Sequence, residues 1–334
     1  MTAGFPVACL GWARPAAGQA APGSGWGPGW GRSWCRKPGL GRAPGAGRRG
    51  GAWPGPSRVR PIRDPSQPQA VELAKKHIAY HMDKFGYQKP NVDFILGYVE
   101  KLGDAGLADE SYDIVVSNCV INLCPDKGAV LREAYRVLKP GGEMYFSDVY
   151  ASRRLSEAAR AHGALWGECL AGALRWSELR SIARDVGFSP PRLVAASPIA
   201  VGHRELESVA GGCQFVSATV RLFKVPAGSR AGPGRVVYNG GVAGHERELV
   251  FDAGFTFKEG EAVEVDADTA AILRSSRFAE EFLIQDGGDA AAPPGCCRGR
   301  AKERICDPFQ LVERLGAPGP GCCPAGACGP RGCC

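Results

Sequence analysis

Residues 131–148 read LREAYRVLKPGGEMYFSD, and the fold can be worked out from this stretch. Apolar side chains recur at helical spacing from Val130 to Val137, so we expect a helix over roughly Lys127–Leu138. The turn Pro140-Gly141-Gly142 then reverses the chain tightly, and the apolar run EMYFSDVY after it reads as a strand. A helix that turns directly into a strand returns the chain to the same sheet, as in α/β domains.

The same alternation of helices and strands extends in both directions from this stretch. Upstream, the apolar spacing predicts an amphipathic helix from Ala70 to Phe85, and the β-branched run around Ile114 predicts a strand buried on both faces. Downstream, SELRSIARDVGF has the spacing of another helix. Past Pro198 several strand-like segments follow one another. We therefore predict an α/β domain with a mainly parallel sheet, followed by a smaller α+β domain.

Composition divides the chain into four parts. Residues 1–69 are rich in Gly, Pro, Ala and Arg and are expected to be disordered. Residues 70–197 are expected to form the α/β core and residues 198–286 the C-terminal α+β domain. Residues 287–334 are expected to be a flexible tail rich in Cys, Gly and Pro.

The net charge of +7 says little about partners, because most of the basic excess lies in residues 1–69. No zinc-finger, homeodomain or RNA-recognition pattern accompanies these arginines, so we expect no nucleic-acid partner. No run approaches the roughly 20 apolar residues needed to cross a bilayer, and no secretory signal is evident. The fourteen cysteines are therefore expected to stay thiols in a reducing cytoplasm, in a chain that acts as a monomer.

Several motifs resemble those of a known family and occur in the same order. The Leu-Lys-Pro-Gly-Gly junction followed by a strand resembles class I S-adenosylmethionine-dependent methyltransferases. Further motifs resemble arsenite methyltransferases: FILGYVEKL, DIVVSNCVINL, SDVY, LWGECLAGAL, GFSPPRLV, FVSATVRLFK, YNGGVAGHE and FDAGFTFKEGEAVEVD. The resemblance covers about residues 70–285 and implies a Rossmann-like methyltransferase sheet followed by a smaller domain.

The resemblance also implies the chemistry and a pair of arsenic-binding residues, Cys119 and Cys169. Thiolates suit As(III), because soft centres prefer sulfur ligands. The implied reaction transfers a methyl group from S-adenosylmethionine to thiol-bound As(III), with thioredoxin or glutathione as reductant. Cys124 and Cys213 have no match in the family's motifs and are expected to be small buried side chains, as free cysteines commonly are.

The front of the family's donor site, an acidic Gly-rich loop after a first strand, is not recognisable in residues 1–69. We therefore expect a sheet incomplete at its N-terminal strands, in which the strand near Ile114 has one unpaired side. The resemblance leaves Val99, Glu100 and Leu102 for the adenine side of the donor site and Asn118 for its amino-acid end. Residues 1–69 are accordingly expected to be a replacement N-terminus.

Two alternatives to catalysis remain open from the sequence. A non-catalytic arsenic- or thiol-binding protein would need only Cys119, Cys169 and the tail cysteines, and a regulatory fragment would act by pairing with a complete chain. The tail cysteines, from Cys296 to Cys334, lack the paired spacing of a zinc site. A redox-accessible tail is the favoured interpretation.

Overall fold

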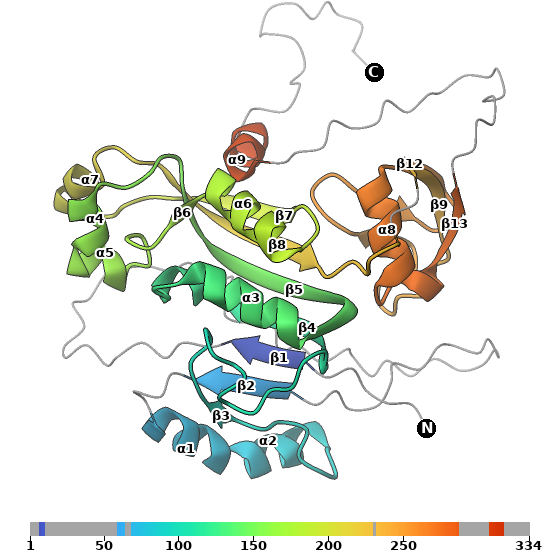
Figure 1. Ribbon diagram of the computed structural model, residues 1–334, viewed down its shortest axis with the longest axis horizontal. Coiled ribbons are helices and arrows are strands. Elements are labelled where there is room, and N and C mark those ends of the chain that lie inside the picture. Colours follow the sequence, from blue (N-terminus) through green and yellow to red (C-terminus); the bar gives the residue numbers. More distant parts are fainter. Residues whose placement is uncertain (1–6, 11–58, 64–67, 230–231, 287–306, 317–334) are drawn as a thin grey trace, which may run out of the picture.

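The computed structural model describes residues 7–10, 59–63, 68–229, 232–286 and 307–316. Its main sheet has the strand order β3-β2-β1-β4-β5-β8-β7, with the short β6 paired to β5 (Figure 1). The strands are β1 (Val7–Leu10), β2 (Val59–Arg63), β3 (Ile95–Leu96), β4 (Tyr112–Asn118), β5 (Leu138–Ala151), β6 (Leu174–Arg175), β7 (Arg192–Ile199) and β8 (Phe215–Phe223). Strands β1 to β6 pair in parallel, whereas β8 runs antiparallel to both β5 and β7.

The prediction that the strand near Ile114 has one unpaired side is wrong. Val7–Leu10 pairs in parallel with β4 on one side and with β2 on the other, so two short strands from residues 1–69 lie inside the sheet. A strand of four residues in a Gly-rich region lacks the long β-branched run by which buried strands are recognised, and this hid β1 from the sequence pattern. Residues 1–6, 11–58 and 64–67 lie outside the described residues.

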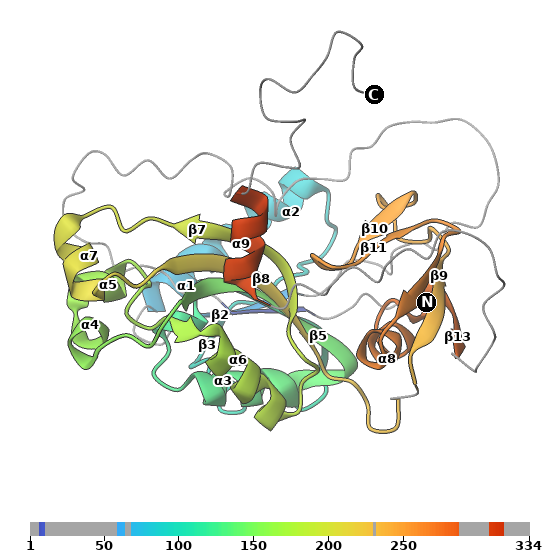
Figure 2. The same cartoon turned by 90° about the horizontal axis from the view of Figure 1, so that it is seen from above.

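Helices cover the sheet and form its connections. They are α1 (Pro68–Lys76), α2 (Ile78–Phe85), α3 (Lys127–Val137), α4 (Glu157–Ala161), α5 (Gly163–Gly167), α6 (Trp176–Val186), α7 (Arg204–Ala210) and α9 (Pro308–Gly316), with one 3₁₀ turn, η1 (Ile121–Leu123). Helices α3 and α6 lie side by side on one face of the sheet (Figures 1 and 2). Between them the rings of Tyr135 and Phe188 pack edge to face, with their centroids 4.9 Å apart. The predicted 127–138 helix is confirmed as α3, capped by Asp126, whose side chain accepts from the Ala129 N–H.

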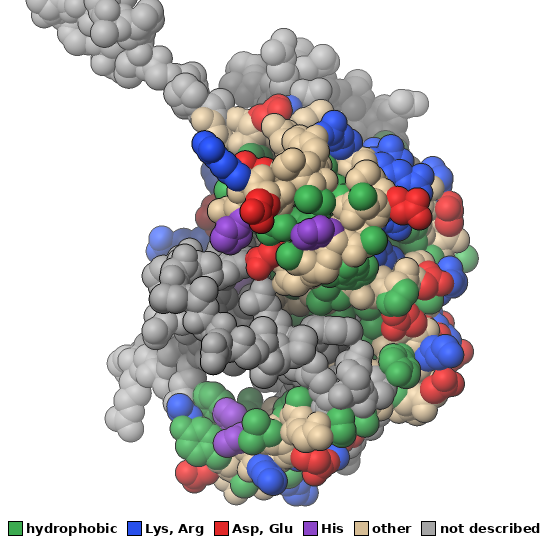
Figure 3. All heavy atoms as spheres, turned by 90° about the vertical axis from the view of Figure 1, so that its left-hand side faces the viewer, with side chains coloured by type: hydrophobic (Ala, Val, Ile, Leu, Met, Phe, Trp, Pro, Cys, Tyr) green, Lys and Arg blue, Asp and Glu red, His purple; other side chains and the backbone are tan. Residues whose placement is uncertain are grey.

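The predicted 70–85 helix is present but divided at His77 into α1 and α2, and it ends at Gly86 in the left-handed conformation, as expected. These two helices lie at the bottom of Figure 3, where hydrophobic side chains reach the surface among charged ones. Leu73, Tyr80 and Phe85 are all exposed there. None of the helices in the described part of the chain is long and apolar enough to cross a membrane.

The second domain begins later than residue 198. The strand over 215–223 was expected in the α+β unit, but it pairs with β5 along nine residues and completes the main sheet. The smaller domain holds a three-stranded sheet, a hairpin and a helix: β9 (Gly234–Tyr238), β10 (Glu248–Val250), β11 (Thr256–Lys258), β12 (Ala262–Val265), α8 (Ala267–Ser275), η2 (Ala279–Glu281) and β13 (Phe282–Asp286). Its core is built around Tyr238, Phe251 and Phe257, each fully buried.

Within the predicted tail, the described residues form α9. This helix lies across β7 and β8 (Figure 2), and Leu311 packs into the core of the main domain. The tail cysteines lie outside the described residues.

Candidate active site

The carboxyl ends of β4 and β5 place the predicted arsenic-binding segments together. Cys119 follows directly after β4, and its N–H donates to the Ser147 carbonyl of β5 at 2.8 Å. The sheet order reverses between β1 and β4, and open α/β sheets bind their ligands at this kind of reversal, beyond the carboxyl ends of the strands. Cys119 therefore stands at the position where the fold favours a site.

Cys169 approaches the same edge from the turn after α5. Its N–H donates to the Trp166 carbonyl at 3.0 Å, which closes the last turn of that helix. Both cysteines are partly exposed. The Cys169 thiol lies close enough to Cys119 to contribute to raising that residue's pKa.

Both cysteines have a backbone conformation that L-residues rarely adopt. Cys119 has φ 53° and Cys169 has φ 61°, and Glu110 is the one other non-glycine residue with positive φ in the part of the chain that the structure describes. Such left-handed residues cost free energy and concentrate at functional sites. Two of these three residues are the pair that the sequence singles out, which is an independent reason to regard this edge as functional.

Burial raises the pKa of the Cys119 thiol to about 12, with further contributions from Asp148 and Cys169. Asp148, at the end of β5, is itself fully buried, and desolvation raises its pKa to about 7. Its carboxylate accepts from the N–H groups of Val149 and Asn122, both at 3.0 Å. The raised pKa keeps Cys119 protonated near neutral pH.

Asp148 and Asn122 lie in the quoted motifs SDVY and DIVVSNCVINL, but the sequence assigned a role to neither. Asn122 is 2 % exposed and donates to the carbonyls of Val149 and Cys169. Their positions in the sequence could have indicated them. Asp148 is an acid near the carboxyl end of a buried parallel strand and Asn122 is an amide three residues after Cys119, so both belong to the edge of the sheet that holds the site.

The four predicted donor-binding residues are placed differently from one another. Asn118 is exposed at the end of β4, and its Oδ1 lies 3.8 Å from the Cys119 Sγ. Glu100 is partly exposed, and its carboxylate adds to the burial that raises the pKa of the Cys124 thiol further than that of Cys119. Val99 and Leu102 pack in the main core, Leu102 with no exposed surface. The side chains available to a ligand are thus those of Asn118 and Glu100.

Cys124 and Cys213 are buried at 2 % and 7 % exposure, as expected for structural thiols. The Cys213 thiol donates to backbone carbonyls of Arg153 and Gln214. No group of three or more His, Cys, Asp or Glu side chains that could hold a metal ion occurs among the described residues.

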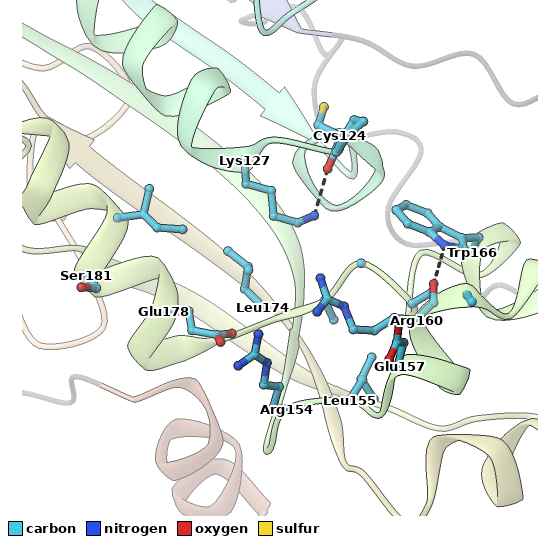
Figure 4. A pocket seen from close by; sticks show the side chains of 16 residues that line it. Cys124, Lys127, Arg154, Leu155, Glu157, Arg160, Trp166, Leu174, Glu178 and Ser181 are labelled. Atoms are coloured by element: carbon cyan, nitrogen blue, oxygen red, sulfur yellow. Dashed lines mark hydrogen bonds between the residues drawn. The ribbon is translucent and has the colours of Figure 1, made fainter.

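A cavity of about 900 Å³ lies behind the Cys169 segment (Figure 4). Its lining includes the small residues Ala171, Gly172 and Ala173. Three cations, Lys127, Arg154 and Arg160, and two carboxylates, Glu157 and Glu178, also line it. Lys127 donates to the Cys124 carbonyl at 3.0 Å, and burial together with nearby Arg160 lowers its pKa. No ion pair within the described ranges engages any of the three cations.

Comparison with known proteins narrows the identity in two steps. Residues 66–187 match the family model of a methyltransferase domain, and with the doubly wound sheet this match defines the class, a class I S-adenosylmethionine-dependent methyltransferase. The arsenite methyltransferases of Rattus norvegicus and Homo sapiens are 57 % and 56 % identical to this chain, over 79 % of it and 71 % and 72 % of their own lengths. The chain belongs to the arsenite methyltransferase family.

Two further comparisons agree with this membership. Residues 231–334 match the model of the arsenite methyltransferase C-terminal domain. The crystal structure of an arsenic(III) S-adenosylmethionine methyltransferase from Chlamydomonas reinhardtii aligns with a TM-score of 0.65 at 43 % identity, covering 70 % of this chain and 79 % of that one.

Proposed function

We propose that the chain transfers methyl groups from S-adenosylmethionine to thiol-bound trivalent arsenic, with Cys119 and Cys169 as arsenic ligands. The observation that carries this proposal is the convergence of the two thiols, each on a left-handed residue, at the carboxyl edge of the sheet. Family membership supports the same chemistry.

Arsenic(III) takes three soft ligands, and the described residues offer two thiols at this edge. We assign the third position to a thiol that arrives with the arsenic. When Cys119 displaces such a thiolate, an arsenic–sulfur bond forms, another breaks, and the Cys119 proton leaves with the departing thiol. The raised pKa of Cys119 suits this exchange, because the residue stays a thiol until arsenic replaces its proton.

Asn118 and Glu100 are suited to hold the donor. An exposed amide and a carboxylate at the strand-order reversal offer hydrogen bonds to the amino-acid and hydroxyl groups of S-adenosylmethionine, while Val99 and Leu102 support the wall from the core. S-adenosylmethionine supplies an electrophilic methyl group on a sulfonium. The arsenic lone pair attacks that carbon as the carbon–sulfur bond breaks toward sulfur, so the residues here act by positioning and need no general base.

We further propose a thiol reductant, glutathione or thioredoxin, which places the reaction in a reducing compartment such as the cytoplasm. The cavity beside the Cys169 segment supports glutathione in particular. Its three cations outnumber the two carboxylates of its lining, Glu157 and Glu178, and none of the three forms an ion pair among the described residues, whereas glutathione carries two carboxylates. Replacement of Arg160 by Ala is expected to raise the KM for glutathione and to leave that for dithiothreitol, which has no carboxylate, unchanged. Equal changes for both thiols would contradict the assignment.

Residue-resolved protection tests the arsenic site. Arsenite is titrated into the reduced protein, free thiols are alkylated, and the tryptic peptide 161–175, whose one cysteine is Cys169, is quantified by mass spectrometry. We expect arsenite to protect Cys169 in the wild type and Cys119→Ser to remove most of that protection. Cys213→Ser, a buried thiol outside the site, is the matched control. Unchanged protection in Cys119→Ser would contradict a shared arsenic site.

Calorimetric titration with S-adenosylmethionine separates catalysis from the alternative of simple arsenic binding. Saturable binding that Asn118→Ala weakens supports the methyltransferase. Arsenite protection without donor binding would leave a non-catalytic arsenic-binding protein.

A further inference from the structure

Asn122 is a buried amide that joins the two segments that carry the cysteines. It lies in η1, three residues after Cys119, and only 2 % of its surface is exposed. One side-chain nitrogen donates to two carbonyls, that of Val149 at 2.8 Å and that of Cys169 at 3.2 Å. A single side chain therefore connects the end of β5 with the Cys169 segment.

The backbone of Asn122 is held from two further directions. Its N–H donates to the Asp148 carboxylate at 3.0 Å. Its carbonyl lies against Gly172, where a Cβ atom would come within 1.8 Å of the oxygen. The residue is thus fixed by β5 and by the chain on the far side of Cys169, and it has little freedom to move independently of either.

This arrangement has a consequence for two thiols that are distant in sequence. Cys119 is positioned by β4 and Cys169 by the turn after α5, so their separation depends on contacts between those elements. Two ligands bind one centre tightly when their separation is fixed in advance, because the second bond then costs little entropy. The Asn122 amide supplies such a contact at the Cys169 carbonyl itself.

We infer that Asn122 is a positioning residue that sets the separation of the two arsenic-binding thiols. The inference rests on the proposed function, since it concerns the same pair of cysteines. Asn122 does not touch the arsenic. It acts through the Cys169 backbone, and its removal leaves both thiols present but free to separate.

Asn122→Leu tests this inference, because leucine has a similar shape and branching but offers no donor. The readout is the arsenite concentration that half-protects Cys169 from alkylation. We expect it to rise about tenfold or more, equivalent to about 1.4 kcal/mol of binding. In turnover, the KM for arsenite should rise while the KM for S-adenosylmethionine stays within about twofold.

Ser189→Ala provides the matched control. Ser189 is 1 % exposed, and its hydroxyl accepts from the Phe223 N–H, so a buried hydrogen bond between side chain and backbone is lost there too. Phe223 lies opposite Glu143, at the other end of β5 from Asp148. A comparable fall in melting temperature with unchanged arsenite protection in this control would show that destabilisation alone does not move the readout.

A second variant keeps the inference testable if Asn122→Leu does not fold. Gly172→Ala retains the amide but drives a methyl group against the Asn122 carbonyl, so the same shift in Cys169 protection is expected. Wild-type protection midpoints in the folded variants would overturn the inference. A wild-type protein that arsenite does not protect at Cys169 would instead overturn the proposed function.

Discussion

At the scale of single residues, Asp148 makes a pH-dependent contribution to stability. Burial raises its pKa to about 7, whereas an aspartate in an unfolded chain loses its proton near pH 4. Between these values the folded state binds more protons, so the free energy of unfolding falls as the pH rises through this range. At pH 8 the buried, charged Asp148 therefore costs the protein part of its free energy of unfolding.

Asp148→Asn should remove that cost. Asparagine is neutral at every pH, so the melting temperature of the variant relative to wild type should rise by a few degrees between pH 5 and pH 8.5. The substitution also removes one carboxylate oxygen as a hydrogen-bond acceptor, but this loss lowers stability equally at both pH values and cancels in the comparison. Scanning calorimetry at the two pH values measures this difference. A difference that does not depend on pH would argue against a buried, titrating Asp148.

The same substitution bears on the thiol. Because Asp148 is among the causes that raise the Cys119 pKa, Asp148→Asn should lower that pKa and speed Cys119 alkylation at pH 8 by several-fold. Peptide mass spectrometry of timed iodoacetamide reactions measures the rate. Cys213 in the same samples serves as the internal reference, and an unchanged ratio of Cys119 to Cys213 rates would count against the predicted coupling.

At the scale of elements, the Pro140-Gly141-Gly142 turn lies within β5, where the pairing of β5 with β4 shifts register, and it also meets the second domain. Gly141 has φ +83°, and a Cβ there would lie 1.9 Å from the Ser275 carbonyl. Its N–H donates to the Lys224 carbonyl at 2.7 Å. The turn therefore requires glycine for two reasons, its left-handed conformation and the close approach of α8.

Gly141→Ala should consequently destabilise the protein by about 3 kcal/mol or more, since backbone has to move. Gly86→Ala is the control, because Gly86 has a similar φ of +73° with nothing within 4 Å of the added Cβ. That variant should lose only the conformational term of about 1 kcal/mol. Urea denaturation of both variants gives the comparison, and equal losses would mean that the contact with Ser275 is unimportant.

At the scale of the whole molecule, a buried ionic network ties the two domains together. Glu143 of β5 accepts from Arg221 of β8 at 2.8 Å and from Arg277, which follows α8, at 2.6 Å. Arg221 also donates to the Phe251 carbonyl at 2.9 Å and stacks over that ring. Opposing guanidinium groups hold the pKa of the Glu143 carboxyl below its usual range despite burial.

Glu143→Gln should leave two arginines without their counter-charge and cost about 3–5 kcal/mol. We expect the two domains of the variant to unfold in separate calorimetric transitions, while the wild type unfolds in one. Glu264→Gln breaks the exposed pair with Arg235 and should cost less than about 1 kcal/mol. A single, barely shifted transition in Glu143→Gln would refute the coupling of the domains through this network.

The sequence predicted those parts of the molecule that local periodicity and family motifs encode. Helix α3, strand β4 and the positions of Cys119 and Cys169 follow from apolar spacing and quoted motifs. Strand β1 did not, because four residues in a Gly-rich region carry almost no periodic signal. The assignment of 215–223 to the main sheet and the role of Asn122 depend on pairing between distant segments, which spacing along one segment cannot reveal.

The central claim, that this chain methylates arsenic held by Cys119 and Cys169, is tested most directly by methyl transfer itself. The purified, reduced protein is incubated with arsenite, glutathione and S-adenosylmethionine labelled in its methyl group, and arsenic species are separated and quantified. We predict labelled methylarsenic from the wild type and from Cys213→Ser, and a loss of at least about 100-fold in Cys119→Ser and Cys169→Ser. Absence of methylarsenic from a folded wild type that binds both substrates, or undiminished product from the cysteine variants, would contradict the claim.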